Sequence, residues 1–285
     1  MESPPLAYRD QEFLEGEDGR PLRILAEYLE PMRRFKAANV QDTVVFFGSA
    51  RVHSPAQARE TLERLEQAQP SSASSLHLER SRKAVEWSRY YSDARTLART
   101  LTAWATTLDS PHHRFVVASG GGPGIMEAAN RGAAEAGGKT IGLNIRLPLE
   151  QAPNPFISDG LSFQFHYFFM RKFWFAYLAK ALVVFPGGFG TLDEMFEILT
   201  LMQTDKLAKQ IQIILYGSAD YWDAILNFEP MVEWGAIGAE DAGLVQRADT
   251  PDEAFALLKT HLTTHHLLPQ TEQEMRAPGI ARTRS

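Results

Sequence analysis

The chain has 285 residues, of which 44% are hydrophobic, and this is enough material for a full-sized buried core. Its formal net charge of -6 argues against a general nucleic-acid or acidic-membrane binder, whose surface is usually basic. The absence of cysteine excludes disulfide bonds, thiolate metal sites and a cysteine nucleophile. No signal-peptide pattern opens the chain, and no apolar run approaches the ~20 residues of a membrane span. We therefore expect a cytoplasmic protein without a nucleic-acid or membrane partner.

The polar stretches divide the chain. Residues 1–20 are polar with early prolines, and we interpret them as a flexible N-terminal arm. Residues 269–285 are interpreted as a flexible C-terminal tail, which leaves residues 21–268 as a single domain. Within it, residues 54–86 form a polar insertion with weak helical signals and no core of its own. The proline- and serine-rich piece at residues 70–75 is expected to be flexible.

Hydrophobic periodicity predicts helices and strands that alternate along the domain. In chain order we expect a helix over residues 21–39, a strand over 43–47, a helix over 87–108, a strand over 115–118, a helix ending near 136, a strand over 140–143, a proline-rich loop over 147–161, a helix over 165–180, a strand over 181–185, a helix ending near 202, a strand over 211–216, a helix over 221–231, a strand over 244–247 and a helix over 251–265. The strands are short, continuous apolar runs, which is typical of parallel strands covered on both faces. The chain is therefore predicted to be an α/β protein, a doubly wound parallel sheet with helices on both faces.

Glycine-bearing turns follow three of the predicted strands. They are Gly48-Ser49, the turn over residues 120–124, here named the GGGPG turn, and the turn over residues 186–190, here named the PGGFG turn. In a parallel sheet these turns share the edge formed by the carboxyl ends of the strands, where ligands bind. We expect the functional site at this edge.

The GGGPG turn resembles a dinucleotide fingerprint only loosely. Ile125 stands where the third glycine of that fingerprint belongs, and no acidic residue follows the next strand, so a standard NAD site is rejected. Gly138-Lys139-Thr140 mimics the end of a P-loop, but Ala133 replaces the required glycine and the order of helix and strand is reversed. The GGGPG turn is left with two interpretations, a tight strand-to-helix turn or a place where backbone approaches a ligand closely.

The PGGFG turn and the residues after it, Thr191-Leu-Asp-Glu194, are more specific. A buried strand, a glycine turn and a helix start together direct free N–H groups and the positive end of the helix dipole at one place, which suits a phosphate. Thr191 and Glu194 also have the spacing of a capping box, in which Glu194 bonds back to the Thr191 backbone. Cap and catalytic carboxylate remain two open interpretations of Glu194.

Met170-Arg171-Lys172 lies on a predicted helix that is aromatic on nearly every side. Such a helix is largely buried, so we expect its charges to face a cleft or an interface. The planar guanidinium of Arg171 suits a phosphate or a ribose. The histidines show no metal-ligand spacing, and no lysine has a recognisable pyridoxal phosphate setting.

These motifs together resemble a known family. PGGFGTLDE, the SGGGPGIMEAANRGA turn and the upstream Met-Arg-Lys are similar to the LOG (LONELY GUY) family, and FFGSAR, NPF and LTLMQT resemble its longer bacterial branch. The LOG proteins are cytokinin riboside 5'-monophosphate phosphoribohydrolases that often carry the label of lysine decarboxylases. The resemblance covers about residues 20 to 265.

The resemblance implies a Rossmann-like fold, a homodimer, and hydrolysis of the N-glycosidic bond of a nucleoside 5'-monophosphate such as AMP. It implies no metal and no organic cofactor. The catalytic pair of the family falls on Arg171 and Glu194. The expected substrate-binding residues are Ser49, Gly121, Gly122, Met170, Gly187, Gly188, Gly190 and Thr191.

In this interpretation Glu194 stabilises the oxocarbenium charge on the sugar and activates water, while the PGGFG turn anchors the 5'-phosphate. Gly121 and Gly122 let the backbone approach the nucleotide, and Ser49 bonds to base or ribose. We expect AMP to be cleaved and adenosine to be spared. The alternative is a nucleotide-binding or regulatory module of the same fold that catalyses nothing.

Overall fold

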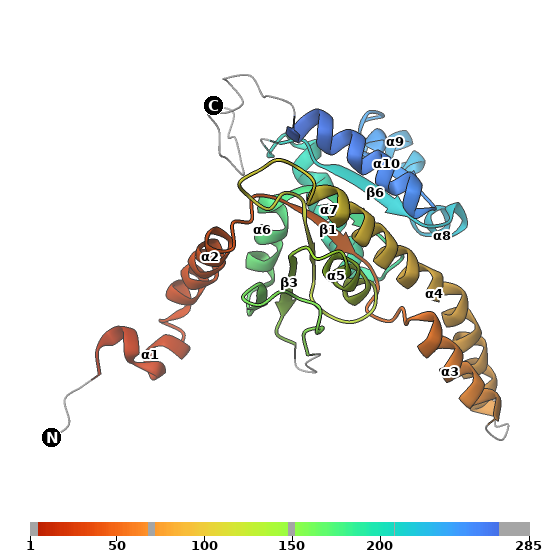
Figure 1. Ribbon diagram of the computed structural model, residues 1–285, viewed down its shortest axis with the longest axis horizontal. Helices are drawn as coiled ribbons and strands as arrows, with labels where there is room; N and C mark the ends of the chain where they lie inside the picture. Colours follow the sequence, from red (N-terminus) through yellow and green to blue (C-terminus); the bar gives the residue numbers. More distant parts are fainter. Residues whose placement is uncertain (1–4, 68–71, 148–151, 208, 268–285) are drawn as a thin grey trace.

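The computed structural model describes residues 5–67, 72–147, 152–207 and 209–267 (Figure 1). Its centre is a seven-stranded, all-parallel sheet in the order β4-β3-β2-β1-β5-β6-β7. The strands are β1 Thr43–Phe47, β2 Val116–Ser119, β3 Thr140–Ile145, β4 Ser162–Phe165, β5 Ala179–Val184, β6 Gln212–Tyr216 and β7 Val245–Ala248. This confirms the predicted doubly wound α/β fold of the Rossmann-like type.

Alternate residues of the central strands enter two separate cores. On β1, Val45 and Phe47 join one hydrophobic cluster, whereas Val44 and Phe46 join the other. Since successive side chains of a strand point to opposite faces, the sheet is buried on both sides. This burial explains why the strands are continuous apolar runs in the sequence.

Each face of the sheet is covered by its own helices. The first cluster contains residues of α2 (Arg20–Ala37), α6 (Phe168–Leu178) and α7 (Phe189–Gln203). The second contains residues of α4 (Ser72–Ala105), α5 (Ile125–Glu135) and α10 (Pro251–Leu262). α6 and α7, which carry the predicted catalytic pair, therefore lie on the same face.

The direction of the chain through the sheet reverses between β1 and β5. From β1 it steps outward through β2, β3 and β4, and it then returns to place β5 on the other side of β1. The crevice outside the carboxyl ends of such a pair of strands is where ligands bind in open parallel sheets. Gly48 and the PGGFG turn follow these two strands directly.

The polar insertion forms a helical hairpin. α3 (Pro55–Gln67) packs along α4, and the two run side by side away from the sheet (Figure 1). The helix predicted to begin at Trp87 begins at Ser72, so residues 72–75 are helical where a flexible piece was expected. Residues 70 and 71 lie outside the described residues. Sequence periodicity failed here because the hairpin buries little apolar surface.

Two further predictions of secondary structure are wrong. Residues 162–165 form β4 at the edge of the sheet, whereas the sequence predicted a loop before them and a helix from Phe165. The helix predicted over residues 221–231 is two helices, α8 (Ala219–Ile225) and α9 (Glu229–Glu233). Pro230 lies in the first turn of the second helix, where its missing N–H is tolerated, whereas in the interior of one continuous helix that N–H would be needed.

The predicted N-terminal arm contains a 3-10 turn, η1 (Ala7–Arg9), and a short helix, α1 (Gln11–Glu15), that leads into α2. The predicted C-terminal tail lies outside the described residues. Flexibility of the arm and of the tail stays a prediction.

α2 continues through a proline. Pro31 lies inside the helix and has no N–H for the carbonyl of Glu27 four residues earlier. That carbonyl accepts a hydrogen bond from the indole Nε1 of Trp174 on α6, at 2.8 Å. The Glu27 carboxylate also accepts hydrogen bonds from the backbone N–H groups of His166 and Tyr167, just before α6. α2 therefore holds the start of the helix that carries Arg171.

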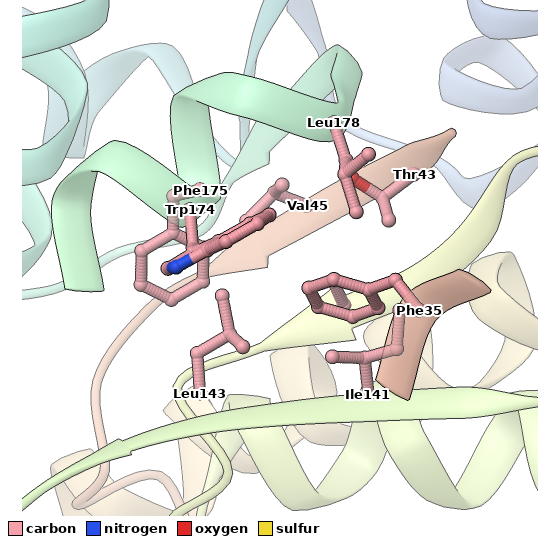
Figure 2. Close-up of a pocket in the computed structure, with 9 residues that line it drawn as sticks. Phe35, Thr43, Val45, Ile141, Leu143, Trp174, Phe175 and Leu178 are labelled. Atoms are coloured by element: carbon pink, nitrogen blue, oxygen red, sulfur yellow. The ribbon is translucent and has the colours of Figure 1, made fainter. Parts of the chain in front are cut away.

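A small hollow lies in the core between the sheet and these helices, as Figure 2 shows. It is lined by Phe35, Thr43, Val45, Ala118, Ile141, Leu143, Trp174, Phe175 and Leu178. Thr43 is the sole polar residue of this lining and stands at the amino end of β1, away from the glycine turns. The hollow is a packing feature of the core.

None of the described helices combines the length and the apolar character needed to cross a bilayer.

Candidate functional site

The candidate site lies at the carboxyl edge of the sheet, where backbone hydrogen bonds connect the three glycine-bearing turns. The N–H of Ser49 donates to the carbonyl of Pro186 at 3.1 Å, and the carbonyl of Ser49 accepts from the N–H of Ile125 at 3.2 Å. Gly124 has a φ of +73°, and a Cβ on it would lie 2.4 Å from the Ser49 carbonyl oxygen. The predicted convergence of the turns is therefore present.

The PGGFG turn opens α7 without a side-chain cap. Gly188 is the N-cap residue, and no described side chain bonds to the helix start. The N–H groups of Phe189, Gly190 and Thr191 have no acceptor within the helix, because the first turn of a helix has none. With the positive end of the helix dipole they form an anion-binding arrangement.

The capping-box interpretation of Glu194 is wrong. Thr191 lies inside α7, and its side chain is buried against Gly187 instead of bonding to the backbone of Glu194. A Cβ on Gly187 would stand 2.2 Å from the Thr191 Oγ1, so this position requires glycine. The Glu194 carboxylate is directed to Arg171.

Gly188 and Gly190 have a different environment. A Cβ on either residue would meet no atom within 4 Å. Neither residue has a positive φ. Nothing in the described part of the chain requires glycine at these two positions. The space that a Cβ would occupy is open to a ligand that approaches the backbone closely.

Tyr221 on α8 holds the PGGFG turn from the side. Its hydroxyl accepts from the N–H of Gly187 at 3.2 Å and donates to the carbonyl of the same residue at 2.9 Å. Burial raises the pKa of Tyr221, so the hydroxyl keeps the proton that it donates. Trp87 of α4 packs edge-on against the Tyr221 ring, at 5.4 Å between ring centroids. Since the Gly187 N–H is used inside the protein, the donors open to a ligand begin at Gly188.

Arg171 and Glu194 form a buried ion pair between α6 and α7. Nη2 of Arg171 donates to Oε1 of Glu194 at 2.6 Å, and both side chains are 11% exposed. Arg171 Nε is also buried and has no hydrogen-bond partner in the described part of the chain. A buried donor without a partner costs about 1–3 kcal/mol, so this atom favours a ligand oxygen beside it.

Burial changes the acidity of this pair. Desolvation raises the pKa of Glu194 to about 7, although the Arg171 charge opposes the shift. A carboxyl group with a pKa near neutrality exchanges protons readily at physiological pH, as general acids and bases do. At neutral pH the Glu194 side chain can therefore be either a charged carboxylate or a protonated carboxyl group, and it can pass from one form to the other.

Other contacts fix the pair in place. The Arg171 guanidinium lies 5.3 Å from the ring centroid of Phe168 and 5.8 Å from that of Phe175. Beside it, Lys172 Nζ lies 2.7 Å from Asp193 Oδ1 and 3.2 Å from Glu197 Oε2. Two neighbouring residues of α6 are thus paired with three acidic residues of α7.

The GGGPG turn is directed inward. Gly121 has a φ of +76°, and a Cβ on it would lie 2.5 Å from the Asn144 side chain. Its N–H donates to Ser119 Oγ, and its carbonyl accepts from the backbone N–H of Asn154. The Asn154 side chain donates to the carbonyls of Gly121 and Gly122. This turn is held by a buried polar network.

The remaining predicted substrate-binding residues have mixed positions. Ser49 lies between the two larger turns, and its hydroxyl accepts from the Arg51 N–H at 3.1 Å. Met170 is 7% exposed and belongs to the hydrophobic core, so its side chain is not open to a ligand. The structure brings Ser49, Gly187, Gly188, Gly190 and Thr191 to one edge, and it places Arg171 beside Glu194.

Sequence reasoning missed Tyr221, Asn154 and Glu27, which position these residues. Tyr221 follows the carboxyl end of β6, and such loops meet at the same edge of a parallel sheet. That placement was a usable signal for Tyr221. Glu27 and Asn154 act through contacts with residues far along the chain, and no local pattern reveals those.

Comparison with known proteins supports the resemblance. The family model described as "Possible lysine decarboxylase" matches residues 126–258. The probable cytokinin riboside 5'-monophosphate phosphoribohydrolase LOG6 of Arabidopsis thaliana is 27% identical over 152 residues, which cover 53% of this chain and 74% of that protein. The LOG2 enzyme of the same plant is 22% identical over 153 residues, which cover 53% of this chain and 70% of that protein. The predicted resemblance to the LOG proteins is confirmed.

Among solved structures, the molybdenum cofactor binding protein of Rippkaea orientalis aligns over 78% of this chain and 96% of its own. Its sequence identity is 19% and its TM-score is 0.44.

Proposed function

We propose that this chain, a relative of the LOG proteins, hydrolyses the N-glycosidic bond of a nucleoside 5'-monophosphate, a purine nucleotide such as AMP, and releases the base and ribose 5-phosphate. The observation that carries the proposal is the buried Arg171–Glu194 pair one helical turn from the uncapped start of α7. The N–H groups that can bind an anion and a carboxylate with a pKa of about 7 thus lie on one helix, beyond the carboxyl ends of β1 and β5, where the strand order reverses.

Each part has a role in the reaction. The N–H groups from Gly188 to Thr191 bind the 5'-phosphate and so place the ribose over α7. As the bond between C1' and the base nitrogen breaks, its electron pair leaves with the base and positive charge develops on the sugar. The Glu194 carboxylate stabilises that charge, accepts a proton from the water whose oxygen bonds to C1', and returns the proton to the departing base.

Arg171 keeps Glu194 in position and in its charged form. The guanidinium lowers the pKa that burial raises, so part of Glu194 is ionised at neutral pH. The free Nε of Arg171 is then available to a ribose hydroxyl or a phosphate oxygen. The sequence analysis allowed either a phosphate or a ribose as the partner of Arg171, and an oxygen of either group can accept a hydrogen bond from this N–H.

The test compares AMP with adenosine. The purified protein is incubated with a panel of nucleoside monophosphates and with the matching nucleosides, and free base is measured by chromatography. The proposal expects base from one or more monophosphates and at least a hundredfold less from the nucleosides, because phosphate binding positions the sugar. Equal cleavage of AMP and adenosine would falsify the phosphate-anchored mechanism.

The same assay separates the enzyme from its rival, a nucleotide-binding or regulatory module. A module binds the monophosphate without base release, and Glu194→Ala leaves that binding unchanged. The enzyme releases base and loses this activity in the variant. Binding is followed by calorimetry on the same samples.

The description of the matching family as a possible lysine decarboxylase would require a lysine placed to form a Schiff base with pyridoxal phosphate, and neither Lys209 nor Lys172 is placed for it. Burial lowers the pKa of Lys209 well below its usual range, as a Schiff-base lysine requires, but its Nζ donates to the carbonyls of Ala176 and Tyr177 at the end of α6. Lys209 precedes β6 and so lies at the amino edge of the sheet, opposite the glycine turns. Lys172 is paired with acidic residues of α7.

A further inference from the structure

Two exposed aromatic rings stand at the start of α6, beside the candidate site. Phe168 and Phe169 are each 50% exposed, although most of α6 is packed in the core. The helix begins just after the carboxyl end of β4, at the edge where the glycine-bearing turns converge. In the proposed mechanism the phosphate and the ribose have binding groups, whereas the flat face of the base has none. Pockets for small ligands are lined largely by apolar and aromatic side chains, and these rings supply such a surface.

The two rings have different neighbours. The Phe168 ring centroid lies 5.3 Å from the guanidinium of Arg171, one helical turn further along. The Phe169 ring lies instead 5.4 Å from that of Tyr167, whose hydroxyl accepts a hydrogen bond from Arg23 of α2. Phe168 therefore belongs to the candidate site, and Phe169 is directed to Tyr167, on the side of α2.

Arg171 connects the Phe168 ring to the proposed catalytic carboxylate. Its Nη2 donates to Glu194 Oε1 at 2.6 Å, so a single guanidinium separates the exposed ring from the group that is proposed to act at C1'. The base is bonded to C1', and a base whose sugar is held at Glu194 therefore lies within reach of this ring. Arg171 Nε, which is buried and has no partner in the described part of the chain, is free for an oxygen of the same nucleotide.

A third exposed ring has a different orientation. Phe189 is 94% exposed and is the first residue of α7. Residues three or four apart share a face of a helix, whereas Glu194 follows Phe189 by five residues. The Phe189 ring is therefore on a different face of α7 from the carboxylate. Of the three exposed rings, Phe168 is the one beside the ion pair.

We propose that Phe168 is the base-binding residue of the site and that the nucleobase of the monophosphate lies against its exposed ring. This inference rests on the proposed function, because its ligand is the base of the same nucleotide. A phenylalanine ring has no hydrogen-bond donor or acceptor, so it selects a flat group by its area and not by its pattern of hydrogen bonds. A purine nucleotide therefore binds better than a pyrimidine nucleotide, since the purine covers more of the ring.

Calorimetric titration of the full chain tests this contact. The ligands are ribose 5-phosphate and the carbocyclic analogue of AMP, which has a base and lacks the ring oxygen that stabilises positive charge at C1', so it is not hydrolysed. Phe168→Ala should weaken binding of the AMP analogue about tenfold, as the loss of base–aromatic stacking does, and change that of ribose 5-phosphate less than about twofold. Phe168→Trp, which keeps a flat ring, should bind the AMP analogue within about threefold of the wild type.

Phe169→Ala is the matched control, because Phe169 is the next residue and is equally exposed but lies against Tyr167. It should bind both ligands like the wild type. The carbocyclic analogue of UMP tests the choice of base: the wild type should bind it more weakly than the AMP analogue, and Phe168→Ala should narrow that difference.

An equal loss for the AMP analogue and for ribose 5-phosphate would show that Phe168 only supports Arg171, and this overturns the proposal. An unchanged affinity of Phe168→Ala for the AMP analogue, or an equal loss in Phe169→Ala, overturns it as well. These three results leave the proposed function standing, because the wild type still binds the nucleotide and its base release is measured separately. A wild type that binds ribose 5-phosphate and the AMP analogue equally well overturns the base contact alone, whereas one that binds neither overturns both.

Discussion

The PGGFG and GGGPG turns both join a parallel strand to a helix at one edge of the sheet, but their glycines meet different needs. Gly121 has a positive φ and lies against Asn144. Its N–H and its carbonyl are hydrogen-bonded to Ser119 and Asn154 inside the protein. Gly188 and Gly190 face open space, and α7 begins without a cap. At Gly121 the glycine serves internal packing, whereas Gly188 and Gly190 leave the backbone open to the outside. A run of glycines alone therefore does not identify a ligand site.

The largest effect is expected at the carboxylate beside the open turn. Glu194→Gln should lower base release from a cleaved monophosphate about 10²–10⁴-fold, because the amide neither stabilises the sugar cation nor exchanges a proton. Glu197→Gln is the control, since Glu197 lies on the same helix and pairs with Lys172. A Glu194→Gln variant within threefold of the wild type would show that Glu194 is not catalytic.

The pH dependence of the reaction sharpens the same point. Burial raises the pKa of Glu194 to about 7, so the carboxylate dominates above pH 7 and is lost as the pH falls. If the charged form is the active one, kcat should fall about tenfold per pH unit below 7. The 5'-phosphate of the substrate has its second pKa at about 6, so it changes charge in the same pH range. Carboxyl ¹³C NMR without substrate therefore assigns the transition, which must be absent in Glu194→Gln. A Glu194 that titrates near its ordinary value contradicts this account.

At the inward turn, Gly121→Ala should reduce stability. The alanine must adopt a positive φ, and its Cβ would lie 2.5 Å from the Asn144 side chain. We expect a loss of about 1–3 kcal/mol in the free energy of unfolding, measured with urea. An unchanged stability would mean that the network around Asn154 adapts easily.

At the open turn, Gly190→Ala should have the opposite pattern. The added Cβ meets no atom within 4 Å, and alanine favours a helix over glycine by about 1 kcal/mol. Stability should therefore stay equal or rise, while KM for the monophosphate increases about tenfold because the methyl group occupies the place of the ligand. A variant with unchanged KM would remove the distinction between the two turns.

The smallest effect is expected at the support of the open turn. Tyr221→Phe removes the hydroxyl that bonds to the N–H and carbonyl of Gly187 and keeps the ring against Trp87. We expect a KM raised about threefold to tenfold with kcat little changed, since the turn binds phosphate and does not react. A fall in kcat at constant KM would assign Tyr221 a different role.

Much of the fold was predictable from the sequence, because it depends on local and periodic signals. The central strands are apolar runs since both their faces are buried, and β1 was predicted with its observed bounds. β4 was missed because an edge strand of four residues, with one exposed side chain, carries little signal. The first half of α4 was missed because it packs against α3, in a polar hairpin, and therefore needs no apolar stripe.

The site was predictable in part for the same reason. The resemblance places Arg171 and Glu194 together, and the structure pairs them at 2.6 Å. Their catalytic role stays a prediction. The capping interpretation of Glu194 failed because a residue 23 positions earlier in the chain competes for its carboxylate. The inward direction of the GGGPG turn depends on Asn144 and Asn154, which only the folded chain brings near.

The proline in α2 has a consequence for how the protein folds. Glu27 loses its helical hydrogen-bond donor to Pro31 and regains one from Trp174, 147 residues later in the chain. α2 therefore completes its hydrogen bonds only after α6 has been synthesised and has docked. An isolated N-terminal fragment should be poorly helical, and assembly of α2 should be a late event of folding that depends on distant sequence.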